Sequence, residues 1–385
     1  MNIFLSIYST NKYLLIYLFI NTLFVFKYSY RIGLTIAVVA VLLYTVFIIS
    51  LVNFLVHNKR KINNCQNFKK TFIAFGILVI VFYFLLNTYV DGNSLNVDRW
   101  SAMSVGIEAL LHGNYPYTAI DHLGGRTSNF PGLFLLGLPS YLLGNIGFLQ
   151  VFVFILLMWY VYKFFPTNFQ RILIVLLFVF SPAYLWEIYT KSDLMSNFIL
   201  LLIFIDLLRR RNQTELFNNP LITGLIIGIL TMTRGVVVLP LIIIFFQPFF
   251  FKINKQRIYF LVAIITAIVL LILPIYLTLP AWKIVKEKNP LVLQTSFLPS
   301  YFNFIFIIVS ILLSYFINKD KIIWWSFVII FIPVLISAFL LANRFGIEKS
   351  LLQSKFDISY FNMSLPFIIF WLGVKFSIKD KGTYW

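Results

Sequence analysis

The sequence predicts an all-α protein: a polytopic bundle of about 11 to 13 transmembrane helices, with an amphipathic interfacial helix in the first large outer loop. Of the 385 residues, 61% are hydrophobic and only 11% are charged. A soluble domain carries about 25% charged residues, so this chain has too little charge to cover a water-facing surface. Apolar runs of about 20 residues, long enough to cross a bilayer, recur along the chain.

The distribution of basic residues supports the same fold class. The formal net charge is +18, yet Lys and Arg gather in short loops between apolar runs. This pattern is typical of cytoplasmic loops in membrane proteins and argues against a nucleic-acid partner. The loops expected inside the cell are 57–70, 209–219, 252–257, 319–321 and 379–381.

The apolar segments predict a single integral membrane domain over residues 1–385. The first segment is followed by "KYSYR" and a second apolar run rather than a cleavage site, so residues 1–70 are expected to hold two retained segments. The run 220–250 is too long for one crossing, and "TMTRG" in its middle predicts the outer turn of a helical pair. The segments fall near 13–26, 32–56, 71–90, 130–143, 146–165, 172–188, 192–208, 220–250, 258–280, 300–318, 322–341 and 360–376.

One of these segments is expected not to cross the membrane. The loops 57–70 and 209–219 are placed inside, because both are basic. Residues 91–128 and 187–193 then lie outside, with three apolar segments between them. An odd number of crossings cannot join two points on the same side. The shortest of the three, 130–143, is therefore predicted to be a half-helix or re-entrant piece that ends at "GNIG".

The longest outer loop, 91–128, carries four of the chain's thirteen acidic residues. Long ordered loops are usually functional. Within it, residues 98–112 place apolar side chains on one side of a helix and polar ones on the other, which predicts an amphipathic helix in the membrane interface with Trp100 as its anchor. "HGNYPY" then ends the helix, with Gly113 at the C-cap.

Asp98 is the first candidate for chemistry in this loop. It begins the helix shortly after a membrane segment, which fixes its carboxylate at a defined depth near the membrane surface. Partial desolvation at that depth gives a carboxylate the raised basicity that a general base needs. The alternative is an interfacial helix whose acids only face water. Asp91 is the rival base, although "GNSLN" after it predicts a flexible turn, and Glu108 and Asp193 are further alternatives.

Several motifs in order resemble a known family. An Asp after a membrane helix, an aromatic residue soon after it, "ALLHGNYPY" and then "SNFPGLFLLGLP" are similar to the multi-spanning glycosyltransferases of the GT-C superfamily. The likeness is greatest to polyprenyl-phosphate-sugar-dependent mannosyltransferases. The matching positions are Asp98, Trp100, Gly113, Pro116, Tyr117, Phe130 and Pro131.

Two later stretches extend the resemblance, so that it covers residues 71–250 and leaves 251–385 as variable C-terminal membrane segments. They are "SPAYLWEIYTKSDLMSNFILLLIFIDLLRRR" and "GLIIGILTMTRGVVVLPLI". The chain departs from the pattern where Asp98 is followed by Arg99 instead of forming an acidic pair. It departs again at "FDISYFNMSLPF", where the family has an Arg and this chain has none.

The resemblance implies an integral membrane protein of a bacterial inner membrane, embedded in membrane lipids, with its active site on the outer face. Mannose or a related hexose would pass, with inversion, from a polyprenyl-phosphate donor to a lipid or glycan acceptor. Asp98 would take the proton of the attacking hydroxyl, and cations would stabilise the departing phosphate. Arg234 interrupts a long apolar run and is expected to bind that phosphate; alternatively it marks a helix end and reaches the lipid headgroups.

Other side chains are weaker candidates for substrate binding. Tyr117 is of a type that stacks on sugar rings, although interface anchoring explains it equally well. Asp193 occupies a position that helps to hold a metal in some relatives, but N-capping by "KSD" is the simpler explanation. No residue is assigned to a metal, and dependence on a divalent ion is left open. The remaining candidates for donor or acceptor binding are Asp91, Glu108, Arg126, Lys286 and Arg344.

Two rival functions remain. A transporter or flippase of lipid-linked glycans is expected to show paired repeats and ionisable residues near helix centres. No convincing internal repeat is found here. A polymerase of surface polysaccharide is expected to carry a large outer loop late in the chain. The dominant outer loop of this chain comes early, which favours the glycosyltransferase.

Overall fold

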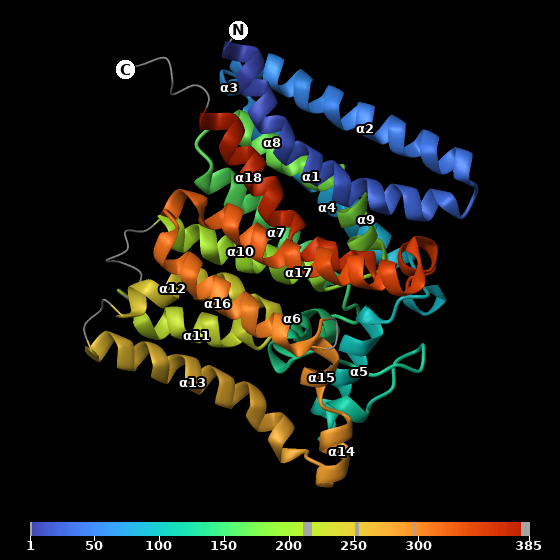
Figure 1. Cartoon of the computed structure of the whole chain (residues 1–385), viewed down its shortest axis with the longest axis vertical. Coiled ribbons are helices and arrows are strands. Elements are labelled where there is room, and N and C mark those ends of the chain that lie inside the picture. The colour runs from blue at the N-terminus through green and yellow to red at the C-terminus, as the bar shows by residue number, and fades with distance from the viewer. Residues whose placement is uncertain (1, 211–217, 251–253, 296–297, 379–385) are drawn as a thin grey trace.

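The computed structural model describes residues 2–210, 218–250, 254–295 and 298–378, and these form a helical bundle without a named strand (Figure 1). The α-helices are α1 (Asn2–Tyr30), α2 (Leu34–His57), α3 (Lys59–Asn63), α4 (Phe68–Tyr89), α5 (Arg99–Leu111), α6 (Pro131–Leu142), α7 (Phe148–Phe164), α8 (Asn168–Val179), α9 (Pro182–Tyr189), α10 (Leu194–Arg210), α11 (Pro220–Thr231), α12 (Val238–Phe250), α13 (Asn254–Leu277), α14 (Trp282–Glu287), α15 (Pro290–Thr295), α16 (Ser300–Phe316), α17 (Ile322–Phe345) and α18 (Leu365–Ile378). Short 3-10 turns are η1 (Gly92–Ser94), η2 (Pro116–Thr118), η4 (Gly235–Val237), η5 (Lys319–Lys321) and η7 (Ile358–Met363), and η6 (Glu348–Leu352) is a π-helix.

Among the described residues, five helices are long and apolar enough to cross a membrane, which supports a polytopic helical membrane protein. A sixth span results if α8 and α9, which meet at a 58° bend, are counted together. The bend has a local cause: Ser181 caps α9 by accepting a hydrogen bond from the Tyr184 N–H, and Pro182 occupies the first helical turn. The five spans are Lys12–Tyr30, Leu34–His57, Phe68–Tyr89, Lys255–Leu277 and Lys319–Phe345.

Loop 57–70 and the start of loop 209–219, both expected inside the cell, lie at helix ends that define one end of the bundle, here called the basic end. The expected inner segment 379–381 lies outside the described residues. The Lys59 amine donates to the Phe376 carbonyl at 2.9 Å, and the Arg210 guanidinium donates to the Phe164 carbonyl at 2.8 Å. Asp206, fully buried on α10, accepts from Arg209 and Arg210 and ties the end of that helix together. Segments far apart in the sequence therefore end at a common level.

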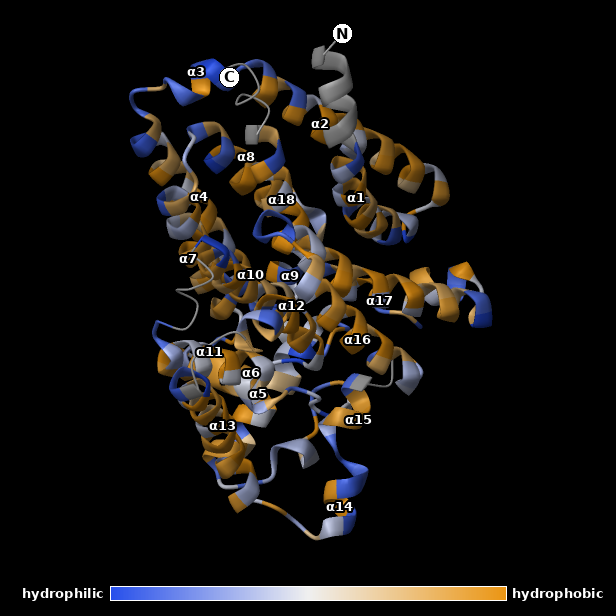
Figure 2. Cartoon of the chain, turned by 60° about the vertical axis from the view of Figure 1, so that its left-hand side comes forward, coloured by the Kyte–Doolittle hydropathy of each residue, from blue (hydrophilic) through white to orange (hydrophobic). Residues whose placement is uncertain are grey.

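The loops expected outside gather at the opposite end, here called the loop end. The Asn145 side chain donates to the Asn87 carbonyl at 2.9 Å, and Gln294 donates to the Ser128 carbonyl at 2.7 Å. Figure 1 places α5, α14 and α15 together, far from α3. Figure 2 shows hydrophilic residues at α3 and α14, with apolar residues along the helices between them. This two-ended arrangement is what a chain that repeatedly crosses a membrane requires.

The core lies around α7, α8, α10 and α18, whereas α2 and α13 carry many exposed apolar side chains. Small residues allow close packing on α13: a Cβ on Gly224 would meet the Phe260 carbonyl oxygen at 2.6 Å, and one on Gly228 would meet the Ala267 methyl at 2.6 Å. Exposed apolar helix surface of this kind suits contact with lipid rather than water.

The 220–250 run is two helices, α11 and then η4 with α12, broken at residues 232–234, so the prediction of a turn at "TMTRG" is confirmed. Helix α6 has only 12 residues, a length of about 18 Å against a hydrocarbon core of about 30 Å. Its first turn is joined to the α11–η4 turn by a hydrogen bond from the Gly132 N–H to the Met232 carbonyl, at 2.7 Å. After α6, Asn145 bonds the end of α4. Both ends of α6 thus touch loop-end turns, as expected of a re-entrant piece.

Helix α5 covers Arg99–Leu111, close to the predicted 98–112, but its surroundings differ from those predicted. Met103 and Ile107 are buried against Leu133 and Phe134 of α6. A Cβ on Gly106 would meet the Phe134 ring at 2.5 Å. The apolar face therefore packs against α6 rather than standing free for lipid. The position of α5 in the membrane interface, with Trp100 as an anchor, stays a prediction. The hydrophobic pattern identified a face that needs cover without saying what covers it.

Candidate active site

Asp98 stands at the N-terminus of α5 at the loop end. Its backbone carbonyl accepts the Ala102 N–H at 2.8 Å, while its side chain makes no capping bond and remains exposed. Among the described residues, its carboxylate forms no ion pair within 4.0 Å. Desolvation and the neighbouring Asp121 carboxylate raise the pKa of Asp98, and the charge of Arg99 opposes them. Asp98 is therefore an available carboxylate of raised basicity.

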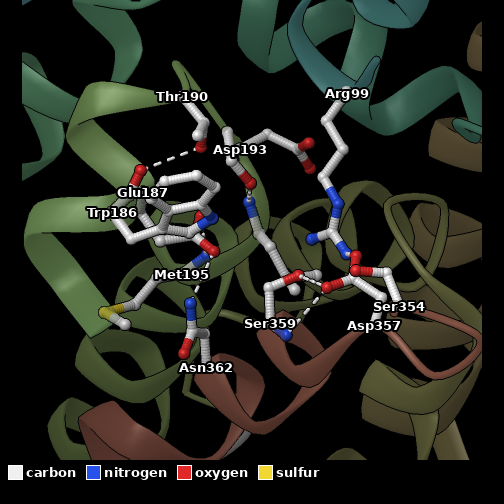
Figure 3. A network of polar contacts seen from close by, with 12 residues as sticks. Arg99, Trp186, Glu187, Thr190, Asp193, Met195, Ser354, Asp357, Ser359 and Asn362 are labelled. Carbon is white, nitrogen blue, oxygen red and sulfur yellow. Dashed lines mark hydrogen bonds and ion pairs between the residues drawn. The ribbon is translucent and has the colours of Figure 1, made fainter. Parts of the chain in front are cut away.

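Arg99, the next residue, is fixed by the late segment of the chain. Its Nη2 lies 2.6 Å from Oδ2 of Asp357 (Figure 3). Its guanidinium also stands 5.0 Å from the centre of the Tyr360 ring. Burial alone would raise the pKa of Asp357, but the Arg99 charge and hydrogen bonds from Ser359 hold it below its usual range. The Arg99 side chain is only 11% exposed. This ion pair joins the start of α5 to residues more than 250 positions later.

A second ion pair joins the α9–α10 turn to the α11–η4 turn. The Arg234 Nη2 lies 2.7 Å from Oδ2 of Asp193, and the two side chains are 11% and 2% exposed. One residue before Arg234, the Thr233 hydroxyl accepts a hydrogen bond from the Asn197 amide at 3.0 Å. The ion pair and this hydrogen bond therefore both hold the α11–η4 turn against the start of α10.

Glu187, on α9, lies close to this pair and is fully buried (Figure 3). Its carboxylate accepts from the Asn362 side chain at 2.7 Å and from the Met195 backbone N–H at 3.2 Å. A buried carboxylate with these partners is a structural link between α9, α10 and η7.

Electrostatic effects at Tyr360 show that the charges converge. Its pKa is raised by burial, lowered by Arg99 and Arg234, and raised by Asp357 and Asp98. Four charges from three separate stretches of the chain therefore act on one phenol. We call this group the charged cluster; it comprises Asp98, Arg99, Asp193, Arg234, Asp357 and Tyr360.

The charged cluster retains unused hydrogen-bonding capacity. Within the described residues, the Arg99 Nη1, the Arg234 Nε and the Asp193 Oδ1 are buried without a partner. Leaving such a donor unpaired is costly, more so for a charged group. Guanidinium groups with spare N–H donors suit the oxygens of a phosphate.

A cavity of about 780 Å³ opens beside the charged cluster. It lies between the end of α4, the start of α5, the α6–α7 turn and the α9–α10 turn. This volume is within the range of small-molecule sites, about 300–1,000 Å³. Its polar and aromatic lining includes Asp91, Asn93, Trp100, Ser104, Tyr141 and Lys191.

The predicted site residues fall into three groups. Asp98, Asp193 and Arg234 come together in the charged cluster, and Asp91 lines the cavity. Tyr117 is buried against Tyr115 and Phe134, with its ring packed in protein rather than open to a ligand. The others are exposed and are not brought to the charged cluster; they are Glu108, Arg126, Lys286 and Arg344.

Sequence reasoning missed four contributors: Arg99, Asp357, Lys191 and the Glu187–Asn362 contact. In the sequence, Arg99 stands out only as a departure from the family pattern. The "FDISYFNMSLPF" segment lacks the Arg of the family pattern, yet it supplies the Asp that pairs with Arg99. A positive residue early and a negative residue late were the available signal, but nothing in the sequence pairs them.

Within the described residues, no group of three or more His, Cys, Asp or Glu side chains is placed to hold a metal ion. Comparison with protein-family models, with curated proteins and with solved structures finds no match to this chain. What the protein does has to be inferred from its own residues and their geometry.

Proposed function

We propose that this chain is an integral membrane glycosyltransferase that moves a hexose from a polyprenyl-phosphate donor to an acceptor hydroxyl at the loop end. One observation carries the proposal: the charges of the exposed Asp98 carboxylate, whose pKa is raised, and of the Arg99 and Arg234 guanidinium groups all act on Tyr360. Both guanidinium groups are largely buried, and each has an unused N–H donor. A base beside phosphate-binding cations is what transfer from a sugar phosphate needs.

The proposed reaction assigns one role to each charge. Asp98 accepts the proton as the acceptor oxygen attacks the anomeric carbon, and the bond between that carbon and the phosphate oxygen breaks. The bonding electrons leave with the polyprenyl phosphate, whose growing negative charge is stabilised by Arg234 and Arg99. Attack opposite the leaving group inverts the anomeric centre. No covalent enzyme intermediate is required.

The apolar surroundings fit the donor and the membrane. A polyprenyl chain is soluble only in lipid, whereas the acceptor hydroxyl comes from water, so the reaction belongs at the membrane surface. We place the loop end on the outer face of a bacterial inner membrane, with about 12 membrane segments in all, counting short apolar helices such as α7 and α18.

The test is transfer of labelled hexose by purified protein in lipid nanodiscs, with a panel of polyprenyl-phosphate hexoses as donors. Asp98→Asn is expected to lower the rate by about 10²–10⁴-fold, the usual contribution of a general base. The matched control is Glu287→Gln, which removes the charge of an exposed carboxylate on α14 and is expected to keep the wild-type rate.

Two outcomes would contradict the proposal. Full transfer by a normally folded Asp98→Asn variant would remove Asp98 from the reaction. Consumption of no donor by the wild type, together with scrambling of lipid-linked glycans in reconstituted vesicles, would instead identify a transporter.

A further inference from the structure

The cavity beside the charged cluster carries hydrogen-bonding groups that the fold itself does not use. One carboxylate oxygen of Asp91 accepts a hydrogen bond from the Asn93 N–H at 3.0 Å, and the other oxygen remains available. Within the described residues, the side chains of Lys191, Ser104 and Tyr141 make no hydrogen bond or ion pair. The cavity therefore offers a carboxylate, an ammonium and two hydroxyls to a ligand.

The charge balance of the cavity distinguishes it from the charged cluster. One carboxylate, Asp91, and one ammonium, Lys191, offset each other, and no arginine lines the cavity. An anionic phosphate is served better by Arg99 and Arg234. A neutral ligand with many hydroxyls satisfies both a donor and an acceptor here. The ring of Trp100, 6.0 Å from the Lys191 amine, adds the flat apolar surface on which the C–H face of a sugar packs.

The backbone at Lys191 is unusual for a lysine. Its φ of 52° is left-handed, in the turn after α9 where the Ser192 N–H bonds the Glu187 carbonyl at 3.0 Å and the Lys191 N–H bonds that of Ile188 at 3.3 Å. Glycine is the residue favoured at this position of a helix C-terminus, because a Cβ makes the conformation costly. A lysine here brings its amine into the cavity at the expense of backbone strain.

Residues that line the cavity are close in sequence to residues of the charged cluster. Trp100 of the cavity follows Arg99 directly, and Lys191 precedes Asp193 by two residues. The start of α5 and the α9–α10 turn therefore each contribute one residue to the cavity and one to an ion pair.

We propose that this cavity binds a neutral sugar unit of the acceptor, with Lys191 and Asp91 bonding its hydroxyls and Trp100 supporting its ring. The inference rests on the proposed function and narrows the acceptor to a glycan. Because Lys191 and Asp91 hold the acceptor and take no proton from it, their loss weakens sugar binding without removing the base.

The experiment measures sugar binding alone, without donor, by titrating the full chain in nanodiscs with mannotriose, maltotriose and chitobiose in turn. At least one of these probes is expected to bind. Lys191→Gly and Asp91→Asn are expected to weaken binding about tenfold, the loss typical of a hydrogen bond to a charged group. Lys283→Ala, on exposed α14, is the control and keeps the affinity.

Lys191→Gly separates binding from folding, because glycine relieves the strained backbone while removing the amine. Its unfolding temperature is expected to equal or exceed that of the wild type. Three results would overturn the inference: the wild type binds none of the sugars, both variants bind sugar with the wild-type affinity, or the wild type binds glycerophosphoethanolamine in place of sugars.

Donor hydrolysis in water, measured separately, tests the proposed function by itself. Donor consumption without sugar binding would refute the acceptor site and support the transferase. Sugar binding that depends on Lys191, without donor consumption, keeps the site and removes the transferase.

Discussion

Three aspartates at the loop end differ in what surrounds them. Asp193 is 2% exposed and paired with Arg234, and Asp357, 45% exposed, is paired with Arg99. Asp98 is exposed and has no such partner among the described residues. An ion pair lowers the basicity of a carboxylate, so Asp98 is the one suited to accept a proton.

The raised pKa of Asp98 predicts the acid side of the pH–rate profile. A general base works only when deprotonated, so kcat/KM is expected to rise with pH through the pKa of Asp98 and to do so above the range of an ordinary aspartate. Part of the rise in pKa comes from Asp121, which bonds the N–H groups of Leu123 and Gly125 through one oxygen. Asp121→Asn keeps an oxygen for those bonds and is expected to move the acid limb to lower pH. An unmoved limb would assign it to another group.

The Arg234–Asp193 ion pair predicts that a single substitution lowers stability and that a second substitution at its partner restores most of it. Arg234→Gln leaves the Asp193 charge buried without its counter-ion and is expected to cost about 3–5 kcal/mol in thermal unfolding. Adding Asp193→Asn removes that charge and is expected to restore most of the stability, but not the transfer rate. Equal stability of the single and double variants would mean that the ion pair is not formed.

At the scale of elements, helix α6 decides where Arg234 stands. Its first turn rests on the α11–η4 turn, two residues before Arg234, through the bond from Gly132 to the Met232 carbonyl. A Cβ on Gly132 would lie 2.5 Å from the Ile229 carbonyl oxygen and 2.6 Å from that of Met232. Because both obstacles are backbone, only glycine permits this approach.

Gly132→Ala is accordingly expected to lower stability by about 1–3 kcal/mol, the usual cost of overpacking, and to slow transfer by displacing Arg234. Gly235→Ala lies in the same turn with a nearest neighbour at 3.9 Å and is expected to be neutral. Thermal unfolding in detergent compares the two variants. Equal effects of both substitutions would refute the close contact at Gly132.

At the scale of the whole molecule, the two ends of the bundle separate basic loops from the candidate site. Contacts from α3, α7, α10 and α18 meet at the basic end, and α5, α9, η4 and η7 meet at the loop end. If the positive-inside rule governs insertion, the charged cluster faces outward.

Cys65, the single cysteine, tests this orientation directly because it is exposed in the basic loop after α3. In intact cells a membrane-impermeant maleimide is expected to leave Cys65 unlabelled. The Cys65→Ser/Ala281→Cys protein, whose cysteine lies in the exposed residues before α14, is expected to be labelled. Labelling of Cys65 but not of the cysteine at position 281 would show that the orientation is opposite to the proposed one.

The sequence by itself determined the helical class, the break at "TMTRG", the short 130–143 helix and the position of α5, because hydrophobicity and turn residues act locally along the chain. It also singled out Asp98, Asp193 and Arg234. Only the tertiary structure decided that Arg99 pairs with Asp357, that Lys191 enters a cavity with Asp91, and that α6 rather than lipid covers α5. Such contacts join residues up to 258 positions apart, and which charges meet depends on helix packing, which no local pattern records.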